Sequence, residues 1–375
     1  MNARKKLNRL SKNTKHGIVL ILMVFIIPML LIVAGFAINL SYMELARTDL
    51  QIASDSASRA ACRTFGYTSN INAARSAAKK AATNNPVMGK VLTLHDKDII
   101  FGTSSRPSPG SKYLFTPSSK KINSVNIDFQ SAASGSIQLP IRIGVSNPNF
   151  AVAQRAIATQ ADVDIVLVVD RSGSMAYAVD EISSPTVLPK KAPKGWDFNG
   201  PVPPYARWTD AMDAIDIFLN DLSSGSQNAT VGLATYSHYS TIDLNLTSNF
   251  ADVSQVLKTY SNPFNAGGTN IGDGIYSGLT NILYSPNRRS EAVPVMILLT
   301  DGIQNWGPSP TDAAYEAADT DVIIYTITFS DEAAQAPMIE IANIGKGKHY
   351  HAKDANTLQN AFKEIAGDLP VLLTQ

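Results

Sequence analysis

The distribution of apolar residues divides this chain into regions with different patterns. Residues 17–40 form one apolar run without a charged side chain, and a helix of about 24 residues spans the roughly 30 Å hydrocarbon core of a bilayer. Residues 41–90 are rich in Ala, Leu, Arg and Ser and predict continued helix, whereas residues 91–160 contain short β-type runs separated by Ser, Pro and Gly. From residue 162 onward, apolar strands alternate with helix-like segments.

The alternating region predicts an α/β fold with a doubly wound parallel sheet, because its strands are almost continuously apolar, as they are when helices cover both faces of a sheet. The expected strands are 164–170, 229–238, 293–302 and 321–330, and the expected helices are 207–222, 250–260, 270–283 and 356–369. Residues 176–205 contain six prolines and predict a long irregular loop beside the first strand. Loops of this length usually carry function or are disordered.

The basic residues before the apolar run predict its orientation in a membrane. Arg and Lys occupy six positions among residues 1–16, which by the positive-inside rule places this tail in the cytoplasm and everything after residue 40 outside. The run is longer than the roughly 15-residue core of a signal peptide, and no clear cleavage site follows it, so we expect a permanent single-pass anchor. A nucleic-acid-binding arm is the alternative interpretation of these charges.

We therefore expect the following parts along the chain. They are a basic cytoplasmic tail (1–16), a transmembrane helix (17–40), a helical stalk (41–90), a small β-rich module (91–160) and the α/β domain (162–375).

Composition excludes several functional classes. The net charge is +1, with 32 basic and 31 acidic residues, so the chain has no general field that would attract nucleic acid. The single cysteine, Cys62, excludes an intramolecular disulfide and a thiolate metal cluster. A bound metal would therefore need oxygen ligands.

Oxygen-bearing side chains follow the strands at the expected ligand-binding edge of the sheet. The segment "DRSGSM" places Asp170, Ser172 and Ser174 after the first strand, Thr269 lies in a glycine-rich loop that opens a helix, and Asp301 ends another strand. Because ligands bind where the carboxyl ends of parallel strands meet, these groups are expected to converge. Oxygen ligands without His or Cys suit Mg²⁺, Ca²⁺ or Mn²⁺, and two carboxylates with neutral hydroxyls favour Mg²⁺.

The combination of "DRSGSM", "GGTN" and "LLTDG" resembles a von Willebrand factor type A domain with a complete metal-ion-dependent adhesion site (MIDAS), over about residues 162–369. This resemblance implies that Asp170, Ser172, Ser174, Thr269 and Asp301 surround one divalent cation. It also implies that the carboxylate of a protein partner completes the coordination of that cation.

The amino-terminal part has a resemblance of its own. Residues 17–61 are similar to the anchor of TadG-like proteins of tight-adherence (Flp-type) pilus assembly, in which a membrane helix runs into an Ala-rich helix. The fifth residue after Gly17 is Leu22, where processed pilins carry a glutamate. This difference argues against prepilin cleavage.

Together these features predict a membrane-anchored, extracytoplasmic binding module rather than an enzyme, with pilus or envelope assembly components as partners and no nucleic acid. One alternative is a structural envelope component in which the metal only braces loops. Another is a metal-dependent hydrolase, although the chain lacks a phosphate-binding loop, an H-E-x-x-H motif and a G-x-S-x-G elbow. His349 and His351 form an alternative metal pair on one strand face. We expect Asp301→Ala to leave the fold largely intact, because the residue lies at a strand end.

Overall fold

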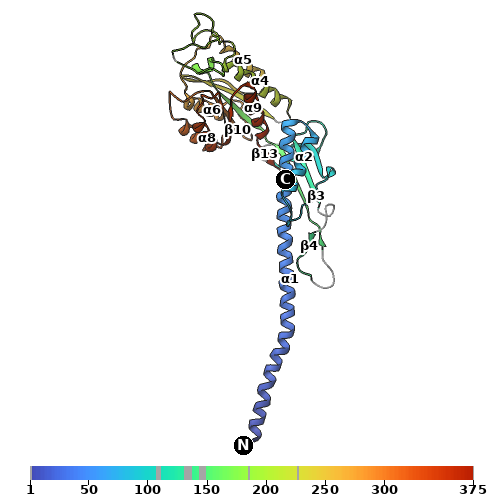
Figure 1. Cartoon of the computed structure of the whole chain (residues 1–375). Coiled ribbons are helices and arrows are strands. Elements are labelled where there is room, and N and C mark those ends of the chain that lie inside the picture. The colour runs from blue at the N-terminus through green and yellow to red at the C-terminus, as the bar shows by residue number, and fades with distance from the viewer. Residues whose placement is uncertain are drawn as a thin grey trace.

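A computed structural model describes residues 2–106, 111–130, 137–142, 149–184, 186–225 and 228–374, and the side chains of all these residues except 2–18, 67 and 130. The chain consists of a head at one end of a long helix, with the N-terminus at the other end (Figure 1).

The long helix α1 (Asn2–Thr68) contains both the predicted membrane helix and the beginning of the predicted stalk. Its most apolar 18-residue window has a mean hydropathy of 3.1 and is 6% buried within the protein. Among the described residues, this is the one helix that is long and apolar enough to cross a membrane. The helix is therefore a candidate membrane anchor, and Pro28 lies inside it.

The part of α1 nearest the head packs against α2 (Ile71–Asn84) and an antiparallel sheet, and we call this assembly the stalk module. The sheet has the order β13-β6-β3-β1-β2. Its strands are β1 (Ile99–Ser105), β2 (Leu114–Pro117), β3 (Ser124–Gln130), β6 (Ala153–Gln160) and β13 (Val371–Leu373). Buried alanines on α1 and α2 permit the close approach of the two helices. A short helix η1 (Asp96–Asp98) precedes β1, and a two-stranded ribbon pairs β4 (Ile137–Gln138) with β5 (Asn149–Phe150).

The head contains the doubly wound α/β domain that the sequence predicts. Its six-stranded sheet has the order β12-β11-β10-β7-β8-β9, and every pairing is parallel except that of β9 with β8. The strands are β7 (Val163–Asp170), β8 (Ala229–Tyr236), β9 (Ser240–Thr247), β10 (Val293–Thr300), β11 (Ile323–Phe329) and β12 (Lys346–Ala352). The sequence analysis missed β9, which is a partly exposed edge strand without a continuous apolar run.

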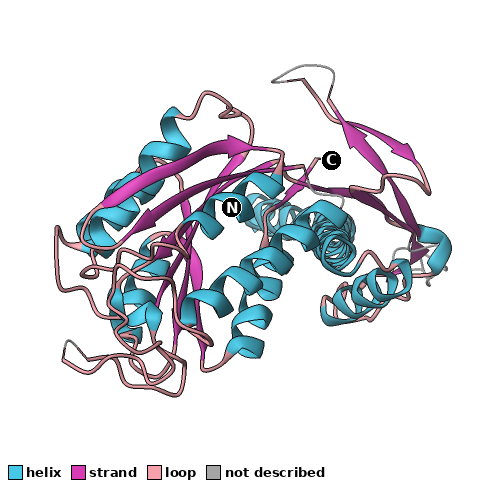
Figure 2. Cartoon of the chain, turned by 90° about the horizontal axis from the view of Figure 1, so that it is seen from above, coloured by secondary structure: helices cyan, strands magenta, loops and turns pink. Residues whose placement is uncertain are grey.

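Helices cover both faces of the head's sheet, as the view from above shows (Figure 2). One face packs against α4 (Arg207–Ser224), α5 (Phe250–Thr259) and α9 (Ala355–Asp368). The other face packs against α6 (Ile271–Tyr284), α7 (Pro310–Ala318) and α8 (Gln335–Ile344).

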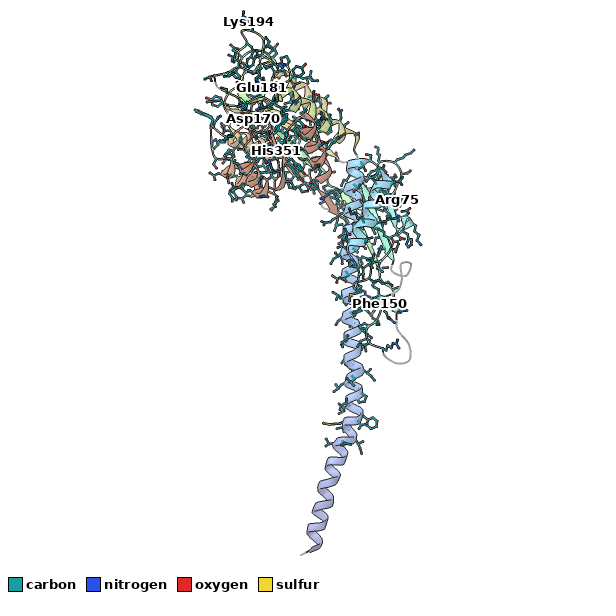
Figure 3. All side chains as sticks on the ribbon, viewed as in Figure 1. Arg75, Phe150, Asp170, Glu181, Lys194 and His351 are labelled. Atoms are coloured by element: carbon teal, nitrogen blue, oxygen red, sulfur yellow. The ribbon has the colours of Figure 1, made fainter. Side chains whose placement is uncertain are left out.

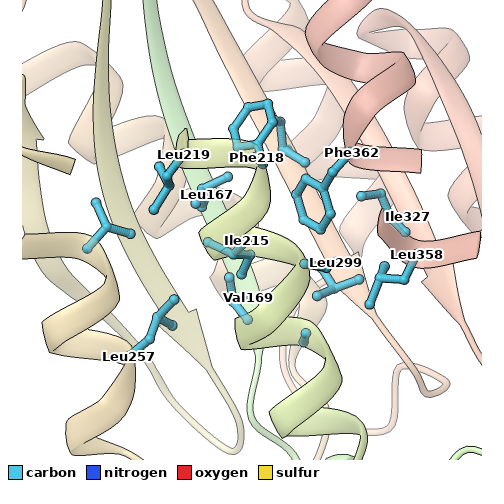
Figure 4. Packing of buried hydrophobic residues seen from close by; sticks show 14 of the residues in the cluster. Leu167, Val169, Ile215, Phe218, Leu219, Leu257, Leu299, Ile327, Leu358 and Phe362 are labelled. Atoms are coloured by element: carbon cyan, nitrogen blue, oxygen red, sulfur yellow. The ribbon is translucent and has the colours of Figure 1, made fainter. Parts of the chain in front are cut away.

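Strand β7 lies in the middle of this core, and its alternate side chains point to opposite faces. Leu167 and Val169 pack on the side where Phe218 of α4 meets Phe362 of α9 with ring centroids 5.4 Å apart (Figure 4). Val168 packs in the opposite cluster. Burial on both faces explains why residues 165–169 are continuously apolar and why the polar residues Asp164 and Asp170 lie near the two ends of the strand.

The head joins the stalk module at more than one point. The chain enters the head directly from β6 and returns from α9 to β13, where Val371 pairs with Gln160. Arg63 of α1 lies 3.6 Å from Asp368 at the end of α9. The three-residue strand β13 thus belongs to the sheet of the stalk module, a pairing that the sequence did not predict.

Candidate metal centre

The carboxylate that ends β7 is held by hydrogen bonds to two neighbouring segments. Asp170 is completely buried. Its Oδ1 accepts a 2.7 Å hydrogen bond from the backbone N–H of Ser172, and its Oδ2 accepts one of 2.7 Å from the Thr300 hydroxyl on β10. The turn after β7 is thereby fixed against the adjacent strand.

The two serines of this turn continue the polar cluster toward the end of β10. The turn forms the short helix η2 (Gly173–Ala176). Ser172 Oγ lies 3.0 Å from Ser174 Oγ, and the Ser174 hydroxyl donates a 2.7 Å hydrogen bond to Oδ1 of Asp301. The structure thus brings together the predicted groups that follow β7 and β10.

The glycine-rich loop before α6 adds the fifth predicted group. The backbone N–H of Gly173 donates a 2.9 Å hydrogen bond to the carbonyl of Gly267, which ties this loop to the first one. A Cβ atom added to Gly302 would lie 3.3 Å from Thr269 Oγ1 and 3.5 Å from Ser174 Oγ. The two hydroxyls therefore face a common space, which the absence of a side chain at position 302 leaves open.

These residues fit a hard divalent cation. The cluster contains two carboxylates and three hydroxyls, and all of these are oxygen donors suited to Mg²⁺, Ca²⁺ or Mn²⁺. In the described part of the chain, no group of three or more His, Cys, Asp or Glu side chains is placed to hold a metal ion. The hydroxyls would consequently have to supply most of the protein's ligands.

Burial strongly affects the acidity of the two carboxyl groups. Burial raises the pKa of Asp170, and the nearby Asp301 carboxylate raises it further. Burial also raises the pKa of Asp301, against the opposing effect of the Arg207 guanidinium. Two buried carboxylates side by side resist full ionisation, and a divalent cation would favour their charged forms.

The cluster opens into a cleft of about 560 Å³ at the surface of the head. Tyr177, Phe198 and Ile303 contribute apolar walls, and Ser174 and Asp301 line the cleft beside them. Ile303 is 61% exposed. Glu181 and Lys194, in the proline-rich loop, lie toward the end of the head farthest from the N-terminus (Figure 3). The cleft is therefore accessible to another molecule.

Sequence analysis missed a buried charged residue that contacts this cluster. Arg207, the first residue of α4, is completely buried, and its Nη1 lies 2.9 Å from Asp301 Oδ2. It occupies a helix face whose other members, including Ala211, Ile215 and Phe218, are buried and apolar. An arginine in a row of apolar residues at helical spacing was the signal that could have identified it.

This ion pair changes the expectation for Asp301→Ala. The substitution would leave a buried guanidinium without one of its partners, which is strongly destabilising even at a strand end. We therefore expect Asp301→Ala to destabilise the fold substantially, and we use Asp301→Asn to test the site.

The alternative histidine pair lies elsewhere, on β12. His349 Nδ1 is 3.0 Å from Thr326 Oγ1, and His351 Nδ1 is 3.0 Å from Thr328 Oγ1. Threonines of the neighbouring strand thus engage both rings, and neither histidine joins the oxygen cluster.

The fold and the oxygen cluster define a doubly wound α/β protein with a polar site at the carboxyl edge of its sheet. Residues 164–364 match the von Willebrand factor type A domain, and the chain belongs to this family. Residues 17–80 match the TadE/G-like family of Flp pilus assembly.

Solved structures with a similar fold come from diverse organisms. An aerotolerance-related membrane protein from Bacteroides fragilis is 18% identical, with a TM-score of 0.43, over 55% of this chain and 100% of that one. A mutant PilB minor pilin from Streptococcus sanguinis is 14% identical, with a TM-score of 0.45, over 74% and 87% of the two chains. Proximal thread matrix protein 1 of the mussel byssus, with a zinc-occupied MIDAS motif, is 18% identical, with a TM-score of 0.42, over 57% and 47%. No curated protein matches the chain significantly.

Proposed function

We propose that this protein is a membrane-anchored, extracytoplasmic binding module that holds a protein partner through a divalent cation, Mg²⁺ in the first instance. The observation that carries this proposal is the meeting of three loops at one sheet edge, where two carboxylates and three hydroxyls form a cluster beside an open cleft. The ligands would be Asp170, Ser172, Ser174, Thr269 and Asp301.

The low negative charge of this ligand set favours a cation that also binds a partner over a cation that the protein encloses completely. Only Asp170 and Asp301 are anionic, and the hydroxyls are neutral, so a bound divalent cation would keep the capacity to accept a carboxylate from a partner. Hydrogen bonds from Ser172 and Thr300 hold Asp170 in place before any partner arrives. Such preorganisation lowers the entropy that binding would otherwise cost.

The cleft walls indicate the kind of partner segment. Phe198 and Ile303 provide apolar surface next to the oxygen cluster. We expect a partner that offers an acidic side chain flanked by an apolar one, because small sites combine mainly apolar walls with a few orienting polar groups.

The amino-terminal half supports a place in the cell envelope. The candidate membrane helix and the TadE/G-like match of residues 17–80 favour an anchored component of a pilus-assembly system. The basic residues before the apolar run favour a cytoplasmic amino end and an extracytoplasmic head. This arrangement would present the cleft to partners outside the cytoplasmic membrane.

A hydrolase is the second candidate, and the hydrogen bonds argue against it. The Ser172 and Ser174 hydroxyls bond to each other and to Asp301. Among the described residues, no histidine hydrogen-bonds to either hydroxyl, so the Ser–His pairing that commonly activates a nucleophilic serine is not found here. A hydrolytic turnover that Ser172→Ala abolishes would favour the enzyme instead.

Titration of Mg²⁺ and Mn²⁺ into the full-length protein in detergent micelles tests the proposal. We expect calorimetry to show binding to the wild type and at least tenfold weaker binding to Asp301→Asn and Thr269→Ala. Thr280→Ala is the matched control, because this exposed threonine of α6 donates its hydrogen bond to the carbonyl of Tyr276 in the same helix. Equal affinity in wild type and folded Asp301→Asn would refute the adhesion site and favour a protein in which a metal only braces the loops.

A further inference from the structure

Arg207 connects the candidate metal site to a loop that lies outside it. Its Nη2 donates a 2.6 Å hydrogen bond to Glu332 Oε2 and another of 2.5 Å to the backbone carbonyl of Glu181. With the bond from Nη1 to Asp301, the guanidinium contacts three separate segments of the head. Among the described residues, no partner is found for its Nε.

Two of these contacts hold the proline-rich segment 176–205, here called the insert. Glu332 accepts hydrogen bonds of 2.9 and 3.0 Å from the backbone N–H of Ser183 and one of 3.1 Å from its hydroxyl. The Glu181 side chain accepts a 3.0 Å hydrogen bond from the backbone N–H of Lys190. Arg207 thus supports the turn at 181–183 both directly and through Glu332.

The two oxygens of the Asp301 carboxylate have different partners. Oδ2 is taken by Arg207, whereas Oδ1 faces Ser174 in the cluster. A cation in the cluster would therefore meet Oδ1, on the same side as the Ser174 hydroxyl, rather than Oδ2. The planar guanidinium fork makes this division specific, because it presents its N–H groups in fixed directions.

The positive charge of Arg207 also changes the net charge of the site around a bound cation. Among the described residues, the acidic side chains with hydrogen bonds to the cluster or to the guanidinium are Asp170, Asp301 and Glu332. With Arg207 present, these groups and a divalent cation sum to a neutral site. Without it, the loaded site would be net negative and would repel the carboxylate of a partner.

We propose that Arg207 is a positioning residue that occupies Oδ2 of Asp301 in competition with the cation, keeps the loaded site receptive to an anionic partner, and fastens the insert at the cleft. This inference rests on the proposed cation site. A purely structural ion pair would leave the cation affinity unchanged, whereas Arg207 would compete electrostatically with the cation for Asp301. Removing its charge should therefore strengthen cation binding while the fold weakens.

Three variants of the full-length protein in detergent micelles separate these effects. Arg207→Met removes the charge and keeps an apolar stem, whereas Arg207→Lys keeps the charge and loses the fork. Arg289→Met is the matched control, because Arg289 pairs at 2.7 Å with the buried Asp164 at the opposite end of β7. Thermal unfolding is followed in EDTA and over a Mg²⁺ series, and trypsin cleavage of the insert is followed in EDTA by mass spectrometry.

We expect Arg207→Met to be less stable in EDTA and to reach half-maximal stabilisation at about tenfold lower Mg²⁺ than the wild type. Arg289→Met should lose stability with an unchanged Mg²⁺ midpoint. Arg207→Lys should keep a Mg²⁺ midpoint within about threefold of the wild type. Trypsin should nevertheless cut its insert several-fold faster, at the exposed Lys190, Lys191 and Lys194, than the insert of wild type or Arg289→Met.

The outcomes distinguish this inference from the function on which it rests. Absence of any Mg²⁺ effect on the wild type would overturn the proposed cation site itself. A wild-type Mg²⁺ effect that Arg207→Met leaves unchanged or weakens would overturn the competition between Arg207 and the cation. Arg207→Lys decides the link to the insert even if Arg207→Met does not fold, because insert cleavage no faster than in Arg289→Met would overturn that link.

Discussion

Asp301→Ala should destabilise the metal-free protein by about 3–4 kcal/mol, because it breaks an ion pair whose two side chains are both completely buried. Removal of one partner of a buried pair costs about 3–5 kcal/mol, and loss of the 2.7 Å bond from Ser174 adds about 1 kcal/mol. Part of this loss is offset, because burial already raises the pKa of Asp301 and disfavours its charged form in the folded state. Relief of its repulsion with Asp170 offsets a further part.

Urea unfolding in EDTA, followed by the fluorescence of the buried Trp196 and Trp208, measures this quantity in the full-length protein. Asp301→Asn keeps an acceptor for Ser174 and should lose about 1 kcal/mol less than Asp301→Ala. The double variant Asp301→Asn with Arg207→Met should lose at least about 1 kcal/mol less than the sum of its single variants, as expected of side chains in contact. Strict additivity, or an Asp301→Ala loss below about 1 kcal/mol, would refute the importance of the pair.

Four further predictions rest on the same structure. Burial, with the nearby Asp301, raises the pKa of Asp170 from 3.8 to about 7. The stability that protonated Asp170 contributes to the metal-free protein should therefore be lost as pH rises from about 4 to about 7, and Asp170→Asn should flatten the slope of stability against pH. Mg²⁺ affinity of the wild type should fall as pH falls below about 7, because protons compete for Asp170, and calorimetry at pH 6 and 8 checks this. Burial raises the pKa of the Cys62 thiol to about 12, so a thiol reagent should label it only after unfolding, and rapid native labelling would contradict the packing of α1. Protease added to cells or spheroplasts should digest the head, and full protection in accessible cells would contradict the proposed orientation.

The sequence predicted those features that depend on local patterns. Strand β7 is apolar at nearly every position because both of its faces are covered, and such a run identifies a central strand. The ends of parallel strands share one edge, so Asp170 and Asp301 could be predicted to lie at the same edge before their contacts were known. Glycines around Thr269 marked the third loop in the same way.

The features that sequence analysis missed depend on contacts between distant segments. Arg207 meets Asp301 across 94 positions and Glu332 across 125 positions, and no local pattern specifies such a pairing. Strand β13 is too short to show an alternation, and its position depends on the edge of β6 that the stalk module leaves open. Burial of a charge is decided by tertiary structure, so the position of Asp301 at a strand end did not indicate the buried ion pair on which the revised expectation for Asp301→Ala rests.

The attachment of the head to α1 has a consequence for the reach of the cleft. From Leu40 to Thr68 a continuous helix rises about 42 Å, at about 1.5 Å per residue. A flexible tether of the same number of residues would keep its ends only about 30 Å apart on average and would let the head sample every direction. Here the head is joined to the stalk module by the entry from β6, by the pairing of β13 with β6 and by the ion pair of Arg63 with Asp368, and these connections restrict its orientation. If the candidate membrane helix anchors the protein as proposed, the cleft would stay at a nearly constant distance from the membrane, and a partner fixed in the same envelope could bind it only at a matching position.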